Sequence, residues 1–162
     1  MSMTLIAFAC LLLALTSALV AGVLLAFSDF VMRGLALARP AGGIEAMQGI
    51  NRTVLRSVFL TAFVGLLPAV YALAAYALFA LDGPGQILIY TGAMIYLITV
   101  FLVTGFGNVP MNRRLAGYDP EAEGARLYWQ RYLTRWTGLN HLRVAGSIAT
   151  SLCFAAAPWL LS

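Results

Sequence analysis

The chain has 162 residues, of which 62% are hydrophobic and only 10% are charged. Soluble domains carry about 25% charged residues, so this composition excludes an ordinary water-soluble fold, a disordered protein and a conventional nucleic-acid binder. All ten basic residues are arginines, and with six acidic residues they give a formal net charge of +4. We therefore expect membrane lipid to cover most of the surface and no nucleic acid to bind.

Four runs of the sequence are apolar for long enough to cross a bilayer, which takes roughly 20 residues. They cover about residues 3–27, 57–81, 86–106 and 144–161. The first lacks the basic leader of a signal peptide, so we interpret it as a retained span. Helices satisfy their own backbone within lipid, and the period-two alternation of a membrane barrel is absent. The sequence thus predicts an all-α fold: residues 1–162 form one four-helix transmembrane bundle with amphipathic helical segments in the cytoplasm.

The arginines fall on one side of these spans. Four lie between the first and second spans, six lie between the third and fourth, and the turn Asp82–Gly85 has none. Basic residues accumulate in cytoplasmic loops, so both Arg-bearing segments are predicted to be cytoplasmic and both termini extracytoplasmic, in the plasma membrane. Contact with anionic lipid then accounts for the basic charge. The sequence leaves open whether the chain forms a homo-oligomer.

Both Arg-bearing segments contain helical patterns. In the first, a break at residues 39–43 precedes a helix-spaced series over residues 44–55, which we interpret as an extension of the second span. In the second, Asp119 is the predicted N-cap and Pro120 the first residue of a helix. If that helix continues past Gly138, one of its faces gathers a set of aromatic and polar side chains: Trp129, Tyr132, Trp136, Asn140 and Arg143.

A polar side chain at membrane depth is costly, so its presence needs a reason. Asp29 follows the first span, either as an interfacial acid paired with Arg33 or as an acid that faces the mouth of the bundle and orients a partner. Asn108 and Asn112 flank Pro110, which we expect to bend or break the third span. The two amides then either cap the broken end or hydrogen-bond a ligand.

His141 is the single histidine of the chain and lies at the predicted cytoplasmic mouth of the fourth span. Imidazole titrates near neutral pH, so His141 is the candidate general base, although a lone interfacial histidine is more often structural. The two cysteines, Cys10 and Cys153, are far apart and lie in apolar runs. No zinc or di-iron ligand spacing is present, so we expect no metal site. Haem with His141 as its sole axial ligand stays open.

Four motifs spread over nearly the whole chain lie at residues 23–32, 43–51, 107–112 and 129–143. Together they resemble a family of small four-helix membrane proteins that includes the fungal anthrone oxygenases. The resemblance implies oxidation of an anthrone methylene to a quinone carbonyl by dioxygen, without a cofactor. It implies His141 as the base, while Asp29, from its position at the mouth, is the second catalytic candidate. The substrate-binding residues that it implies are Asn108, Asn112, Trp129, Tyr132, Trp136, Asn140 and Arg143.

The resemblance thus implies an anthrone-oxygenase-like oxidoreductase that acts on a lipophilic aromatic or quinone-type molecule. The alternative is a non-catalytic membrane subunit that binds lipid, a hydrophobic small molecule or a partner protein. The clustering of Asn, His and Trp near one mouth favours the enzyme, whereas the lack of an unmistakable catalytic set favours the alternative. A transporter is disfavoured because the spans lack acids and broken helices near the midplane.

Overall fold

A computed structural model describes residues 3–161, and every regular element in that range is a helix. The chain begins with one continuous helical run, Met3–Leu37. That run consists of α1 (Met3–Ala26), the π-helical segment η1 (Phe27–Val31) and α2 (Met32–Leu37). A separate helix, a 3-10 turn and the next long helix follow: α3 (Pro40–Thr53), η2 (Val54–Arg56) and α4 (Val58–Ala80).

The second half of the chain forms two more long helical runs. The first, Pro84–Ala116, consists of α5 (Pro84–Ile95), the π-helical segments η3 (Tyr96–Leu102) and η4 (Thr104–Asn108), and α6 (Val109–Ala116). The second is α7 (Glu123–Ala156), which ends in the 3-10 turn η5 (Ala157–Leu160). The sharp turn before α5 depends on Gly83, whose φ of 91° strains any other residue.

Three of these runs are long and apolar enough to cross a membrane: Met3–Leu37, Val58–Ala80 and Pro84–Ala116. The all-α prediction is therefore confirmed, and three of the four predicted spans coincide with such helices. α7 has a polar first half and an apolar second half and does not meet the same criterion, so the fourth span remains a prediction. At about 1.5 Å per residue, the 34 residues of α7 extend about 50 Å, well beyond the roughly 30 Å hydrocarbon core of a bilayer.

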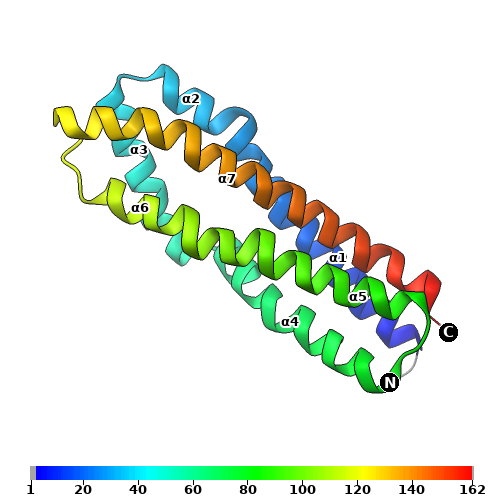
Figure 1. Cartoon of the computed structure of the whole chain (residues 1–162). Coiled ribbons are helices and arrows are strands. Elements are labelled where there is room, and N and C mark those ends of the chain that lie inside the picture. Colours follow the sequence, from blue (N-terminus) through cyan, green and yellow to red (C-terminus); the bar gives the residue numbers. More distant parts are fainter. Residues whose placement is uncertain (1–2, 162) are drawn as a thin grey trace.

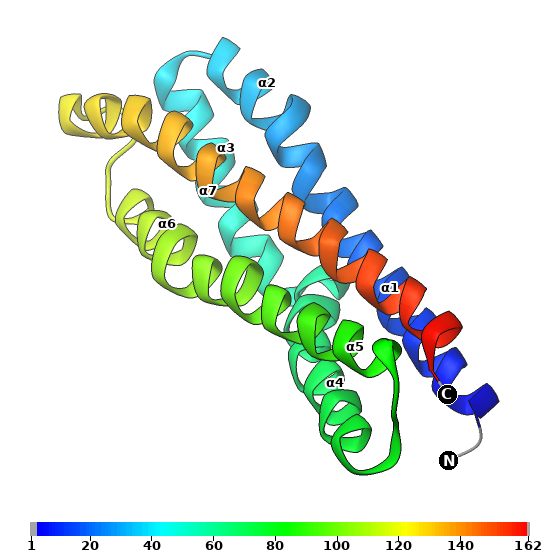
Figure 2. The same cartoon turned by 45° about the vertical axis from the view of Figure 1, so that its right-hand side comes forward.

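α7 packs along α1, its C-terminal part also lies against α5, and α4 lies against α5 on the other side (Figures 1 and 2). Gly146 permits the closest approach, because a Cβ built there would overlap the hydroxyl of Thr99 and lie 2.8 Å from its Cβ. A Cβ built at Gly92 would likewise lie 3.1 Å from side-chain atoms of Cys153 and Phe154. Small residues thus set the spacing of α7 from the third run, as is common between membrane helices.

The two ends of the bundle differ in character. The start of α1, the α4–α5 turn and η5 lie at one end, and α2, α3, α6 and the start of α7 lie at the other (Figures 1 and 2). The two Arg-bearing segments predicted to be cytoplasmic therefore lie at the same end. The positions of these segments agree with the predicted topology, while the membrane side of each end stays a prediction.

Three local predictions are wrong. α3 is not an extension of α4, because Ser57 adopts an extended conformation between them and its hydroxyl caps α4 by accepting from the Leu60 amide. α7 begins at Glu123 and not after Asp119, whose carboxylate instead accepts from the Glu121 amide in a turn. The predicted break at Pro110 is also absent, since η4 leads directly into α6 within one continuous helical run, while a bend at this proline stays a prediction.

Candidate functional site

A cavity of about 700 Å³ lies between α3, η2 and the start of α4 on one side and η4, α6 and α7 on the other, with the end of α1 and η1 completing its wall. This volume lies within the range of small-molecule sites. Most of the wall is apolar or aromatic, including Phe27, Phe59, Phe63 and Trp136. The polar residues of the lining are fewer: Gln48, Asn51, Arg52, Thr53, Ser57, Thr104, Asn112, Arg113 and Arg143.

Arg143 is the most buried cation of this lining, with 6% of its surface exposed. Its Nη1 donates to the Thr104 hydroxyl at 3.1 Å, and its Nη2 donates to the Asn140 amide oxygen. The guanidinium carbon lies 5.3 Å from the centre of the Trp136 ring, within the range of a cation–π contact. Its Nε is buried and has no hydrogen-bond partner. The side chain is thus held from three sides, and its Nε–H has no acceptor in the protein.

Asn140 fixes Arg143 to the first helical run. Its amide nitrogen donates to the Leu24 carbonyl and to the Ser28 hydroxyl, both at 2.6 Å. Ser28 belongs to the π-helical turn η1, a type of irregularity that is frequent at functional sites. Asn140 is fully buried, so its carbonyl oxygen has a fixed direction towards the guanidinium. Asn140 therefore positions Arg143 and does not line the cavity itself.

Asn112 links α6 to the aromatic face of α7. Its side-chain oxygen accepts from the Tyr132 hydroxyl at 2.6 Å and from the Trp136 indole nitrogen at 2.8 Å. Burial raises the pKa of the Tyr132 phenol, so the group stays protonated and remains a donor. Asn108, fully buried one turn earlier, donates to the Trp136 backbone carbonyl at 3.2 Å. Asn112 thus fixes the Trp136 ring and Asn108 contacts the backbone of the same residue, and neither amide caps a broken helix.

The aromatic face of α7 forms a stack that points into the molecule. The Trp129 and Tyr132 ring centres are 5.4 Å apart, those of Tyr132 and Trp136 are 5.9 Å apart, and Phe27 of η1 lies 5.9 Å from Trp136. All three α7 aromatics are buried. These three rings therefore face the interior of the bundle and not the surrounding lipid. Gly43 of α3 makes room for Trp129, whose ring would be 3.0 Å from a Cβ at that position.

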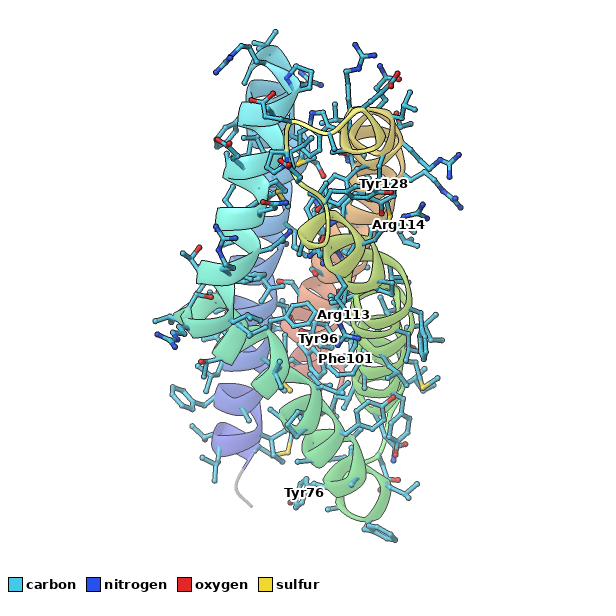
Figure 3. All side chains as sticks on the ribbon, turned by 90° about the vertical axis from the view of Figure 1, so that its left-hand side faces the viewer. Tyr76, Tyr96, Phe101, Arg113, Arg114 and Tyr128 are labelled. Atoms are coloured by element: carbon cyan, nitrogen blue, oxygen red, sulfur yellow. The ribbon has the colours of Figure 1, made fainter. Side chains whose placement is uncertain are left out.

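Two neighbouring arginines of α6, Arg113 and Arg114, extend to different levels of the molecule. Figure 3 shows Arg113 reaching to the level of Tyr96 and Phe101 in the middle of the molecule, below Arg114 and Tyr128. Arg114 lies over the Tyr128 ring, 4.8 Å from its centre. Two neighbouring arginines therefore serve different places, because Arg113 lines the cavity and Arg114 covers the outer end of the aromatic stack.

Residues 55–153, which are more than half of the chain, match the family model described as anthrone oxygenase. The chain belongs to the anthrone oxygenase family. The match covers Thr104, Asn112, Trp136 and Arg143 and excludes α1, η1 and α3. No curated protein and no solved structure matches the chain. The suspected resemblance is thus confirmed at the level of family.

In this anthrone oxygenase family member, three of the nine predicted site residues line the cavity: Asn112, Trp136 and Arg143. Four others are buried directly behind them and hold them in place: Asn108, Trp129, Tyr132 and Asn140. The two remaining residues, His141 and Asp29, are exposed and do not belong to the lining. Their catalytic roles stay predictions, whereas the binding set is gathered at one place.

Asp29 also lacks its predicted partner. Among the described residues the one ion pair joins Arg126 and Glu123 at 3.9 Å, both on the exposed face of α7. The predicted pair between Asp29 and Arg33 is therefore wrong. The π-helical turn η1 contains Asp29 and alters the helical spacing on which the i, i+4 prediction depended.

Seven of the nine polar lining residues were not predicted as site residues, and three of these seven contact other parts of the site. Gln48 of α3 donates to the Leu115 and Tyr118 carbonyls, both at 3.0 Å, and so satisfies carbonyl groups at the end of α6. Asn51 lies next to Tyr132, and its side chain interacts with the phenol. The Thr104 hydroxyl accepts a hydrogen bond from the Arg143 guanidinium. Gln48 and Asn51 lie within the second of the four motifs, which was the available signal, while Thr104 had none.

Proposed function

We propose that the protein oxidises a lipophilic anthrone-type aromatic with dioxygen at the cytoplasmic mouth of a four-span membrane bundle. The observation that carries the proposal is the cavity of about 700 Å³, which combines aromatic walls with a buried, positioned arginine in a member of this family. Flat aromatic ligands suit such walls, because ring stacking adds to the apolar burial. The membrane supplies the lipophilic substrate by partition.

The reaction needs little from the protein. An anthrone methylene loses a proton to give an enolate, which passes one electron to dioxygen. The carbon radical and superoxide then combine into a peroxide, which takes up a proton. Loss of the remaining C–H proton with cleavage of the O–O bond releases water and leaves the carbonyl. One anthrone and one dioxygen thus give one anthraquinone and one water, and no external reductant is required.

The lining residues have distinct tasks in this proposal. Trp136 and Phe27 contact the faces of the substrate, and Phe59 and Phe63 close the apolar wall on the α4 side. Arg143 stabilises the enolate oxygen, a fixed charge at the place where negative charge develops. Asn112 keeps the Trp136 indole in its orientation. The role of His141 as general base stays a separate prediction, because the imidazole lies outside the cavity lining, and it is tested below.

The test is turnover by purified protein in detergent. A dihydroxyanthrone is added, and oxygen consumption and quinone absorbance are followed together against the spontaneous oxidation of the same solution. We expect one oxygen consumed for each quinone formed, at a rate proportional to the protein concentration. Binding of the anthrone without oxidation above the spontaneous rate overturns the enzymatic proposal and favours the alternative, a non-catalytic binding protein for hydrophobic molecules.

A pair of variants on α4 shows whether turnover occurs in this cavity. Leu60→Trp places a large ring in the lining, so turnover should fall by at least tenfold. Leu78→Trp changes the same residue type on the same helix at a position that is 61% exposed and outside the lining, so turnover should be retained. Equal turnover by the two variants places the reaction elsewhere.

A further inference from the structure

The cavity contains positive charge that the protein does not neutralise. Arg52, Arg113 and Arg143 line it, and no described lining residue is an Asp or Glu. Arg52 and Arg113 are exposed, so solvent screens them, but Arg143 is almost completely buried. Neutral oxygen atoms accept its two assigned hydrogen bonds, and no carboxylate among residues 3–161 pairs with it. A buried charge without a counter-ion is strongly unfavourable.

The protein also keeps this charge in place. The contacts of Arg143 with Thr104, Asn140 and the Trp136 ring involve three different helical elements, counting the attachment of Asn140 to η1. Its Nε donor is buried without a hydrogen-bond partner, and Arg143 lines the cavity. A positioned, charged donor without an acceptor indicates an occupant that brings acceptor oxygen.

The lining offers no group that takes up a proton from the occupant. None of its described residues is His, Asp, Glu, Cys or Tyr. An acidic hydroxyl or an acidic methylene bound here therefore loses its proton to water, and the charge of Arg143 determines how much of the bound ligand is ionised. An opposite charge within about 4–6 Å lowers the pKa of an acid by about 1–3.

We propose that the cavity binds its aromatic ligand as an oxyanion, a phenolate or enolate, with Arg143 as the buried counter-ion. This inference rests on the proposed function, because it makes the ionised and reactive form of the substrate the bound one. The aromatic wall favours an ionised aromatic over the other source of anionic oxygen, a phospholipid headgroup. Arg143 thus drives the first step of the oxidation by electrostatics, while water carries the proton away.

A non-oxidisable chromophore separates binding from turnover. A dihydroxyanthraquinone absorbs differently as phenol and phenolate, so its ionisation is titrated by absorbance, bound to the protein and in empty detergent micelles. With wild-type protein we expect the apparent pKa of the bound dye to be lower by about 1–3 than in the micelles. This corresponds to at least a tenfold preference for the anion.

Two substitutions and one control assign the effect. Arg143→Gln should abolish the preference for the anion, and Arg143→Lys should retain most of it, because the lysine keeps the charge at this position. Arg135→Gln removes the same charge from an exposed position on the same helix and should leave the dye titration unchanged. Melting temperatures of all variants identify any that fail to fold, and Arg143→Lys keeps the test informative if Arg143→Gln does.

The outcomes separate this inference from the proposed function. An unshifted dye titration in a protein that oxidises the anthrone overturns the inference alone. A shifted, Arg143-dependent titration in a protein that does not oxidise the anthrone supports the inference and overturns the function. Vesicles of phosphatidylglycerol, compared with phosphatidylcholine, form the last arm. If phosphatidylglycerol displaces the dye and the protein shows no preference for the dye anion, Arg143 binds a lipid headgroup and the proposal is overturned.

Discussion

Two neighbouring residues of α7, Asn140 and His141, show how finely the site depends on helical phase. Asn140 is fully buried and holds Arg143, while His141 is exposed on the other side of the helix. The sequence placed both in one motif, and composition alone cannot tell which of two adjacent side chains points inward. The series Trp129, Tyr132, Trp136, Asn140 and Arg143 did identify the inward face by its spacing, because the helix continues unbroken past Gly138.

The prediction that His141 is a general base has a direct test. General bases contribute about 10²–10⁴-fold to turnover. Since the imidazole lies outside the cavity lining, we expect His141→Gln to lower turnover by a much smaller factor, at an unchanged melting temperature. Oxygen consumption per folded molecule is the measurement. A loss within the range of general-base catalysis assigns the base to His141 and requires that side chain to reach the substrate.

Asn112 gives a stability prediction at the same scale. Its side-chain oxygen accepts from both Tyr132 and Trp136, so Asn112→Leu leaves two donors without an acceptor. Each buried donor without a partner costs about 1–3 kcal/mol. The melting temperature of the purified variant should therefore fall clearly, and Asn112→Asp, which keeps an acceptor oxygen, should lose less. Equal melting temperatures for the two variants would show that the hydrogen bonds do not stabilise the fold.

At the scale of elements, the sequence predicted helices well and their ends poorly. Hydropathy and arginine positions located the first three spans, and four of their six predicted ends lie within a few residues of the observed ends. The π-helical segments were not predicted, and the first and third runs extend to Leu37 and Ala116. Whether a helix ends or continues at Ser57 or Pro110 depends on packing between α3, α6 and α7, which a local pattern does not contain. The cavity forms at these junctions, so most of its missed residues come from α3, η2 and the start of α4.

The close approach of α7 to the third run is testable with two glycines of one helix. A Cβ at Gly146 would overlap Thr99, whereas nothing lies within 4 Å of a Cβ at Gly138. Gly146→Ala should therefore destabilise the protein by about 1–3 kcal/mol through overpacking. Gly138→Ala should be neutral or stabilise it by up to about 1 kcal/mol through helix propensity. Melting temperatures in the same detergent decide, and Gly146→Ala combined with Thr99→Gly should recover part of the loss if the overlap is its cause.

At the scale of the whole molecule, the reaction class depends on whether the purified protein contains a bound metal. No group of three or more His, Cys, Asp or Glu that could hold a metal ion occurs among the described residues. We expect elemental analysis to find no stoichiometric copper, iron or zinc, and activity to survive treatment with a chelator. One metal per chain, lost on His141→Gln, would replace the cofactor-free oxidation with metal-assisted chemistry.

The arrangement of the bundle in the membrane is the remaining prediction. In a chain with Cys10→Ala and Cys153→Ala, single cysteines report sidedness towards a membrane-impermeant maleimide in spheroplasts. Asp82→Cys, in the α4–α5 turn, should react in intact spheroplasts, because basic residues favour the cytoplasm and this turn has none. Asp119→Cys, between α6 and α7, should react only after permeabilisation. Trp159→Cys, at a position that is 87% exposed in η5, should behave like Asp82→Cys if α7 crosses the membrane. If Trp159→Cys, like Asp119→Cys, is labelled only after permeabilisation, α7 does not cross the membrane. If all three cysteines show the opposite labelling pattern, the orientation is inverted and the mouth of the cavity lies outside the cell.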